Sequence, residues 1–170
     1  YQTRQYDYNP LNYYAISKLT VDYWVKENLS RFKAPVVGLR YFNVYGLDEK
    51  KDDFCTSPVY RFSEQAKKDG VIKIFSGSQN TYRDFVWVGD VVSIITQEHE
   101  SGIYDLGCSE PISFLDVAEM ISEKYGSTIK FIPFPEIIKG KYQKFSRARE
   151  EFHGYNFMQV KEFVDKYLDA

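Results

Sequence analysis

The hydrophobic pattern alternates along the chain between short stretches typical of strands and longer stretches typical of helices. Short apolar or extended stretches have the length and β-prone composition of strands. They cover residues 36–42, 71–75, 83–88, 102–106 and 129–132. Between them, apolar residues recur every three or four positions, as on one face of a helix. These helical stretches are 11–30, 57–68, 90–95, 114–125 and 160 to nearly the C-terminus. Strands that alternate with helices predict an α/β protein.

Residues with known preferences for helix ends mark where several of these helices begin and end. Ser57-Pro58 predicts the start of the second helix and Asp69-Gly70 its end, because proline fits the first turn and glycine the position after the last. Asp90 is expected to cap the third helix with its carboxylate. Ser113, with Asp116 three residues later, predicts a capping box at the fourth.

The first helix and the overall composition supply material for a packed core. Tyr14, Val21, Trp24, Val25 and Leu29 of this helix are expected to be available for burial. Of the 170 residues, 44% are hydrophobic and 18% are aromatic, which excludes disorder as the main description. The length predicts a single compact unit.

Charge and cysteine usage exclude several classes of function. The 22 Lys and Arg residues nearly balance the 24 Asp and Glu residues, so neither a nucleic acid nor a membrane is expected as a partner. No apolar run approaches the ~20 residues of a membrane-spanning helix. Cys55 and Cys108 stand in no metal-ligand spacing, and no metal site is expected. This pattern is typical of a cytoplasmic globular protein.

The sharpest chemical motif is Tyr14-Ala15-Ile16-Ser17-Lys18. Residues four apart on a helix share a face, so the Tyr14 phenol and the Lys18 ammonium are expected to meet. A neighbouring positive charge lowers the pKa of a phenol, which otherwise lies near ~10, and makes the phenol usable as a proton shuttle. Alone, such a pair is usually ordinary helix surface. Here it precedes a strand that ends in Arg40–Gly46, and ligands of open α/β sheets bind beyond the carboxyl ends of strands.

Four further motifs extend this pattern along the chain. They are Arg40–Gly46 (RYFNVYG), Phe75–Ser78 (FSGS), Arg83–Val91 (RDFVWVGDV) and the tail Phe131–Ser146. With Tyr14-x-x-x-Lys18, their spacing resembles the extended short-chain dehydrogenase/reductases that act on nucleotide sugars. The tail is most similar to the ADP-heptose 6-epimerase family. The resemblance covers nearly the whole chain, but only the C-terminal half of the family's length.

The resemblance implies a fold and a division of the chain. Residues 1–46 would be the remainder of a Rossmann dinucleotide-binding domain. Residues 47–170 would form mainly a smaller α/β domain that binds the nucleotide sugar, with 83–107 partly returning to the Rossmann sheet. The Arg83 guanidinium is then expected within reach of the Ser76–Ser78 turn.

The resemblance also implies a reaction, an epimerisation in lipopolysaccharide biosynthesis, and roles for single residues. A nicotinamide cofactor, NADP or NAD, would take hydride from an ADP-sugar and return it to the opposite face. Tyr14 would be the catalytic acid/base, Lys18 would bind the cofactor ribose and tune that phenol, and the Val44 backbone would contact the cofactor. The residues expected at the ADP-sugar pocket are Asn43, Arg61, Phe75, Ser76, Gly77, Ser78, Arg83 and Tyr142.

A second catalytic base is expected in the loop after RYFNVYG, where the family has a lysine. Ungapped counting from Asn43 puts Asp52 at that place, and a one-residue gap puts Lys51 there, next to Lys50. Lys51 is therefore the candidate for the second base. Arg61 replaces the family's usual histidine with another cationic donor.

One expected element is absent from the sequence. No G-x-x-G-x-x-G turn, which would cradle a dinucleotide pyrophosphate, occurs, and the chain begins at Tyr1 without an initiator Met. We therefore expect weak NAD(P) binding and no activity from this chain alone. We also expect the strand at 36–42 to lack neighbouring strands, so that either a complementing N-terminal half or a second copy of the chain in a homo-oligomer covers it. Two alternatives stay open. One is a 4-epimerase, 4,6-dehydratase or reductase acting on another nucleotide sugar, and the other is a non-catalytic nucleotide-sugar-binding module.

Overall fold

The computed structural model describes residues 10, 12–47, 49, 56–136 and 142–168. Its helices are α1 (Tyr13–Asn28), α2 (Pro58–Asp69), α3 (Val88–Ile95), α4 (Phe114–Tyr125) and α5 (Val160–Lys166), with short 3-10 helices η1 (Leu29–Arg31) and η2 (Ser78–Asn80). Its strands are β1 (Val37–Tyr41), β2 (Asn43–Tyr45), β3 (Val71–Phe75), β4 (Tyr82–Arg83), β5 (Phe85–Trp87), β6 (Gly102–Leu106), β7 (Ile112–Ser113) and β8 (Thr128–Ile132). No helix in this described part is long and apolar enough to cross a membrane.

The strands pair mainly in parallel. β1 pairs with β6, β2 with β5 and β3 with β8 in parallel, while β4 and β7 form a short antiparallel pair. Parallel neighbours require crossover connections, and the helices between the strands supply them. The predicted α/β fold is confirmed. The expectation that the strand at 36–42 lacks neighbours is wrong, because β1 pairs with β6 along its whole length.

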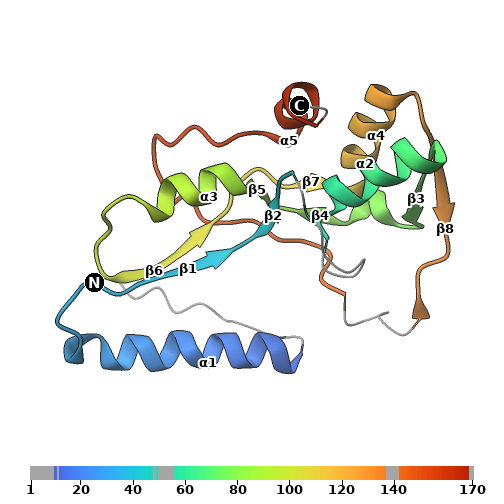
Figure 1. Cartoon of the computed structure of the whole chain (residues 1–170). Helices are drawn as coiled ribbons and strands as arrows, with labels where there is room; N and C mark the ends of the chain where they lie inside the picture. The colour runs from blue at the N-terminus through green and yellow to red at the C-terminus, as the bar shows by residue number, and fades with distance from the viewer. Residues whose placement is uncertain (1–9, 11, 48, 50–55, 137–141, 169–170) are drawn as a thin grey trace.

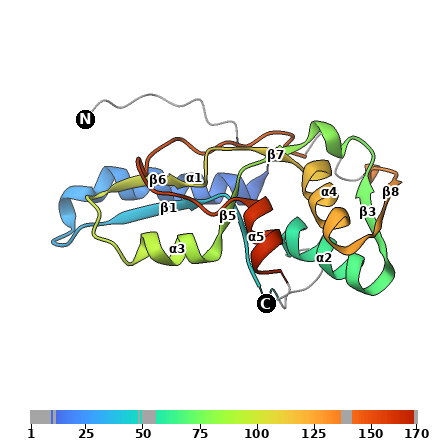
Figure 2. The same cartoon turned by 90° about the horizontal axis from the view of Figure 1, so that it is seen from above.

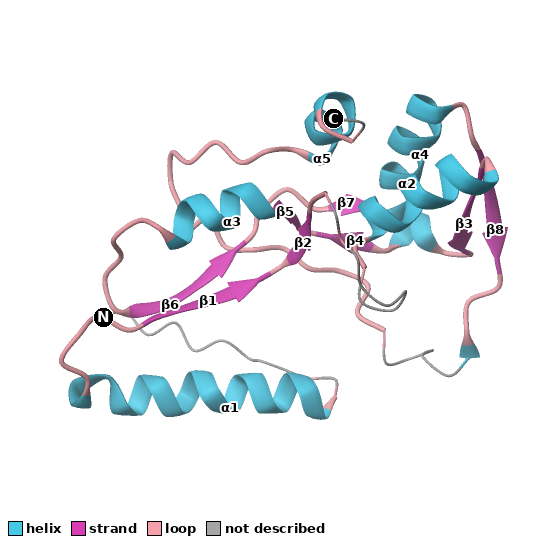
Figure 3. Cartoon of the chain, in the orientation of Figure 1, coloured by secondary structure: helices cyan, strands magenta, loops and turns pink. Residues whose placement is uncertain are grey.

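The elements gather at two ends of the molecule. Figure 1 shows β1 and β6 between α1 on one side and α3 on the other, whereas α2 and α4 lie beside β3 and β8 at the opposite end. Seen from above, α5 lies next to α4, and β5 and β7 lie between the two ends (Figure 2). The segment leading into α5 crosses the molecule as a loop (Figure 3). This loop brings C-terminal residues to strands that lie far away in sequence.

Two clusters of buried side chains form the core. The larger joins α2, α4 and α5 to β3, and includes Val59, Phe62, Ile72, Ile74, Val117, Ile121, Phe163 and Val164. The smaller joins α3 to β5 and β6 through Val86, Val91, Ile94 and Leu106. The apolar residues predicted on one face of α4 thus point to the larger cluster.

The predicted ends of α2 and α4 are confirmed. Ser57 caps α2 by accepting a backbone N–H bond of 3.2 Å from the first turn, Pro58 begins the helix, and Gly70 follows it in the left-handed region with φ 64°. At α4, the Ser113 hydroxyl accepts the N–H of Asp116 at 3.0 Å, and the Asp116 carboxylate accepts the N–H of Ser113 at 2.8 Å. Both helices therefore begin and end where local sequence preferences place them.

Asp90 is not the cap of α3, and that prediction is wrong. The helix begins at Val88 after the extended residue Trp87, so Asp90 lies inside the first turn and is buried. Its carboxylate accepts the N–H of Met158 at 2.8 Å and the hydroxyl of Tyr155 at 3.1 Å. Burial raises the pKa of Asp90, and these two bonds partly oppose the increase. The carboxylate binds the C-terminal loop instead of its own helix end.

The first helix also differs from expectation, because none of its residues is buried. Tyr14, Val21 and Trp24 are 71%, 58% and 58% exposed, while Val25 and Leu29 are half-buried. The expected burial of this helix is therefore wrong for the described chain. Its apolar side chains remain available to further partners.

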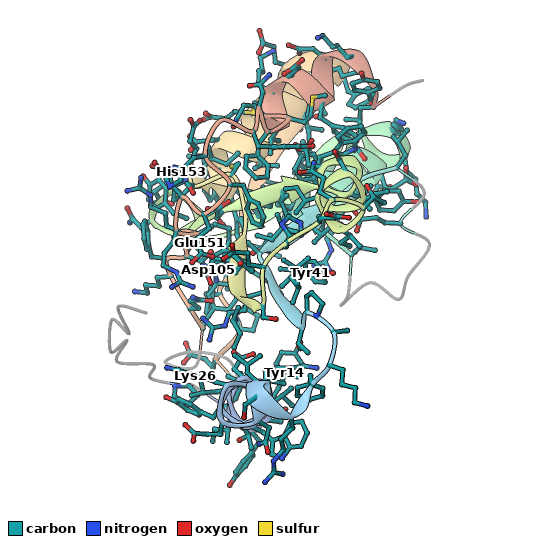
Figure 4. The ribbon with its side chains drawn as sticks, turned by 90° about the vertical axis from the view of Figure 1, so that its left-hand side faces the viewer. Tyr14, Lys26, Tyr41, Asp105, Glu151 and His153 are labelled. Atoms are coloured by element: carbon teal, nitrogen blue, oxygen red, sulfur yellow. The ribbon has the colours of Figure 1, made fainter. Side chains whose placement is uncertain are left out.

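A network of charged side chains connects α1 to the β1–β6 pair. The Arg40 guanidinium on β1 contacts Asp22 of α1 at 2.7 Å and lies 3.6 Å from Asp105 of β6. Asp105 also accepts a bond of 2.8 Å from Arg149, which pairs with Glu151 at 3.0 Å. Figure 4 shows Asp105 and Glu151 close together. Ion pairs thus join α1 and the C-terminal loop to the sheet.

Candidate functional site

A pocket of about 420 Å³ lies beside the turn that follows β3. It is lined by Phe75, Ser76, Gly77, Ser78, Asn80, Thr81, Phe114, Phe134, Tyr142 and Lys144. The turn and the Tyr142 segment are far apart in sequence, and the fold brings them together. Five residues that the sequence assigned to a substrate pocket, Phe75, Ser76, Gly77, Ser78 and Tyr142, therefore share one wall.

The backbone shapes the turn without help from a ligand. Gly77 has φ 94°, a region that favours glycine, and a Cβ there would point into open space. The Ser76 N–H donates to the carbonyl of Ile132 at 2.8 Å, and the Ser78 hydroxyl donates to the carbonyl of Phe75 at 2.6 Å. The turn is thus fixed by bonds to its own backbone and to β8.

Aromatic rings form much of the pocket wall. The ring centroids of Phe75 and Phe134 are 5.5 Å apart, and those of Phe134 and Tyr142 are 5.3 Å apart, both in edge-to-face geometry. Phe114 completes the aromatic lining. Such a wall suits the flat faces of a nucleobase or a sugar, because aromatic rings bury much apolar area in fixed positions.

Arg83 lies directly behind this wall and is almost completely buried, with 7% of its surface exposed. Its guanidinium carbon is 5.2 Å from the ring centroid of Tyr142 and 5.5 Å from that of Phe114. The same guanidinium donates to the carbonyl of Tyr82 at 2.9 Å and to the carbonyl of Gln143. Burial lowers the pKa of Arg83, and the nearby Tyr142 phenol opposes that shift. Arg83 therefore holds the Tyr142 segment against β4.

The next residue, Asp84, fixes the same region from the other side. Its carboxylate is fully buried and accepts the backbone N–H groups of Cys108 at 2.8 Å, Ser109 at 2.9 Å and Ala148 at 2.7 Å. These three bonds tie the loop after β6 and the segment after Tyr142 to β5. Asp84 thus holds two segments that are distant in sequence beside the residue that follows Arg83.

Arg61 of α2 brings a second guanidinium to this region. Burial raises the pKa of Tyr142, and the positive charges of Arg83 and Arg61 partly offset the increase. The Arg61 Nε is buried and has no hydrogen-bond partner among the described residues. A buried donor without an acceptor is costly to a fold. Arg61 is not among the residues that line the 420 Å³ pocket.

Asn43 and Val44 follow the end of β1 but do not line the pocket. The Asn43 N–H donates to the carbonyl of Asp84 at 3.0 Å, and Val44 pairs with Val86 of β5. Asn43 lies opposite Phe85, two residues beyond Arg83 along the chain, and its neighbour Val44 packs against the smaller core cluster.

Tyr14 and Lys18 form the predicted pair on α1. The Lys18 ammonium lies over the Tyr14 ring, 5.3 Å from its centroid, and Tyr14 is largely exposed. Figure 4 shows Tyr14 on α1, below Tyr41 at the end of β1. Neither Tyr14 nor Lys18 lines the 420 Å³ pocket. The two predicted centres are therefore separate surfaces in the described chain.

The loop after β2 carries the candidate for a second base, Lys51, which lies outside the described residues. Glu49 in this loop is described, and its carboxylate accepts the Ser57 hydroxyl at 2.6 Å and the Ser57 N–H at 2.8 Å. It also accepts the Gly46 N–H at 3.2 Å. Glu49 thus ties the loop to the start of α2, where a carboxylate is favoured.

The pocket also contains residues that sequence reasoning missed. Phe134 lies in the tail motif at 131–146, and Phe114 lies at the start of the helix predicted at 114–125, but neither is among the residues expected at the pocket. Lys144 follows Tyr142 by two positions in the sequence and lines the same pocket. That spacing was the available signal for Lys144.

A second hollow of about 390 Å³ lies near Cys108, Arg147 and His153. Burial, with the negative charge of Asp84, raises the pKa of the Cys108 thiol to about 12. The thiol is therefore protonated near neutral pH and is not a nucleophile there.

Comparison with known proteins agrees with this picture. The family model described as "NAD dependent epimerase/dehydratase family" matches residues 1–107. The ADP-L-glycero-D-manno-heptose-6-epimerase of Brachyspira hyodysenteriae is 38% identical over 95% of this chain and 54% of its own length. The chain therefore spans about half the length of this curated relative.

Solved structures give the same result. The ADP-L-glycero-D-manno-heptose-6-epimerase of Helicobacter pylori superposes with a TM-score of 0.77 at 28% identity, over 94% of this chain and 51% of that one. The UDP-glucose 4-epimerase of Thermus thermophilus, solved with NAD, gives a TM-score of 0.74 at 23% identity, over 95% of this chain and 56% of that one. The described fold thus corresponds to about half of such a protein.

Proposed function

The chain belongs to the NAD dependent epimerase/dehydratase family, and from this premise we propose that it is the nucleotide-sugar-binding part of an epimerase similar to ADP-L-glycero-D-manno-heptose-6-epimerase. The observation that carries this proposal is the pocket beside the 75–78 turn, with Tyr142 on its wall and Arg83 stacked behind it. Its ligand would be an ADP-sugar. The place of such a reaction would be the cytoplasm, in lipopolysaccharide biosynthesis.

Two guanidinium groups near Tyr142 support an anionic ligand at this pocket, although neither is among its lining residues. Arg61 has a buried Nε without an acceptor among the described residues. Arg83 uses two bonds to backbone carbonyls, and a guanidinium has more N–H donors than these two bonds require. Together they would supply positive charge to a pyrophosphate, while the aromatic wall would hold the base or sugar. Asn43, whose backbone N–H donates to the carbonyl of Asp84 next to Arg83, would contact the sugar.

Tyr14 and Lys18 fit the role of a proton-transfer pair. The Lys18 ammonium lies over the Tyr14 ring, and the exposure of Tyr14 leaves its hydroxyl open to a substrate. When bound, a nicotinamide cofactor, NAD or NADP, would supply reversible hydride transfer. Lys18 and the backbone of Val44 would contribute to holding it. Lys51 would move the second proton that inversion at carbon requires.

A complementing N-terminal half would supply the glycine-rich turn, and α1 offers an exposed apolar surface to such a half or to a second copy of the chain.

Calorimetric titration with an ADP-heptose tests the proposal, with UDP-glucose as the comparison ligand. We expect saturable binding of the ADP-sugar to this chain, weakened in an Arg61→Ala variant because Arg61 supplies a buried donor. Absence of binding to a folded wild-type chain would contradict the proposed function. Stronger binding of the UDP-sugar would favour a different nucleotide-sugar reaction.

A further inference from the structure

Lys144 is the one charged side chain among the described residues that line the 420 Å³ pocket. The other lining residues are neutral, and no described carboxylate faces this wall. Arg83, although close, lies behind the rings of Phe114 and Tyr142 and donates to two backbone carbonyls. The charge that a ligand meets first on entering the pocket is therefore that of Lys144.

The backbone of Lys144 is held firmly against β4. The Tyr82 N–H donates to the carbonyl of Lys144 at 2.8 Å, and the Ser146 N–H donates to the carbonyl of Tyr82 at 3.2 Å. Phe145 forms a parallel bridge with Tyr82. Tyr142 and Lys144 both line the pocket, while Phe145 is 58% exposed. The position of Lys144 at the pocket is thus set by backbone pairing.

The ammonium group of Lys144 is available to a ligand. Lys144 is exposed, and its ammonium makes no ion pair with the carboxylates of the described chain. A lysine ammonium is a compact point charge on a flexible stem, which suits phosphate oxygens whose exact position varies. The aromatic rings beside it offer a surface for the uncharged parts of the same molecule.

We propose that Lys144 contacts the phosphates of a nucleoside diphosphate held in this pocket, and that it makes the pocket select a diphosphate over the bare nucleoside. This inference rests on the proposed function, because it takes the same pocket as the nucleotide-sugar site. It adds a specificity-determining residue, since Lys144 distinguishes ligands by their charge. The aromatic wall, by contrast, binds charged and uncharged nucleosides alike.

The test is a comparison of ADP, AMP and adenosine binding to the full chain by calorimetry. A Lys144→Ala variant is expected to bind ADP about three- to tenfold more weakly, while adenosine affinity stays unchanged. Lys144→Arg keeps the charge and should retain most of the ADP affinity. Lys130→Ala is the matched control, because Lys130 is an exposed lysine on β8 that does not line the pocket. Thermal unfolding of each variant checks that the fold is unchanged.

The outcomes separate this inference from the proposed function. If the wild-type chain binds ADP and Lys144→Ala binds it equally well, Lys144 has no such role and the proposed function stands. Equal weakening of ADP and adenosine would also overturn the inference, because the effect would then not depend on phosphate. If the folded wild-type chain binds none of the three ligands, the proposed function fails and the inference fails with it.

Discussion

The pairing of Arg83 with Tyr142 gives a prediction whose size can be worked out from the structure. The guanidinium carbon lies 5.2 Å from the Tyr142 ring centroid and is almost completely buried, so their attraction is little weakened by water. A cation–π contact of this kind contributes about 1–2 kcal/mol. The bond from Arg83 to the carbonyl of Gln143 does not enter the coupling, because it involves backbone that Tyr142→Ala leaves in place. We therefore expect a coupling free energy of about 1–2 kcal/mol between Arg83 and Tyr142.

A double-mutant cycle measures this coupling. Urea unfolding of the wild type, Arg83→Ala, Tyr142→Ala and the double variant gives four free energies of unfolding, from which the interaction is obtained directly. The matched control is the same cycle with Arg147→Ala in place of Arg83→Ala, because the half-exposed Arg147 side chain donates to the carbonyl of Ser109 at 3.0 Å and pairs with Glu150 at 3.5 Å. Single-variant effects that add within ~0.3–0.5 kcal/mol for Arg83 and Tyr142 would refute the reasoning.

Three further predictions concern separate features of the chain. Gly107→Ala should lower the free energy of unfolding by about 1–3 kcal/mol in urea titrations, because its Cβ would lie 2.6 Å from a carboxylate oxygen of the buried Asp84. Gly38→Ala is the control and should not lower it, because its Cβ would make only an ordinary contact of 3.4 Å with Ile103. Equal stability of the two variants would contradict the packing argument. Tyr14→Phe, in the enzyme assembled with its cofactor half, should leave ADP-sugar affinity unchanged and reduce turnover about 10²–10⁴-fold in steady-state kinetics; unchanged turnover would exclude Tyr14 as the acid/base. Cys108, studied in a Cys55→Ser variant, should react with iodoacetamide about a thousandfold more slowly at pH 8 in the folded chain than in the unfolded chain, because a pKa of about 12 leaves little thiolate. The rate for the folded chain should rise only as the pH approaches that pKa. Similar rates for the folded and unfolded chains at pH 8 would show that Cys108 has an ordinary thiol pKa.

The sequence predicts those parts of the fold that depend on local preferences. The Ser113–Asp116 capping box and the left-handed Gly70 appear where expected, because each involves residues within one turn. Asp90 has the same local preference for a helix end, but its carboxylate instead binds Met158 and Tyr155. Those partners lie more than sixty residues away, so no local pattern could reveal them.

The candidate site shows the same division between local motif and distant contact. The FSGS motif and Tyr142 come from the sequence, and the fold brings them to one pocket. The position of Arg83 behind that pocket could not be predicted, because it depends on hydrogen bonds from Arg83 to the carbonyls of Tyr82 and Gln143. It also depends on the neighbouring Asp84 carboxylate, which accepts the N–H of Ala148. Sequence motifs thus predict five of the residues that line the pocket, whereas tertiary hydrogen bonds determine how the segments that carry them are arranged.

The central claim is that a nucleoside diphosphate binds beside the 75–78 turn, and amide chemical shifts of the ¹⁵N-labelled chain test it most directly. On titration with ADP, we expect saturable shifts at Ser76, Gly77, Ser78 and Lys144, which line the 420 Å³ pocket. The amides around the second hollow, such as Gly154, should shift little. Shifts confined to that second hollow, or no saturable shifts at 76–78 when ADP is in large excess, would contradict the account.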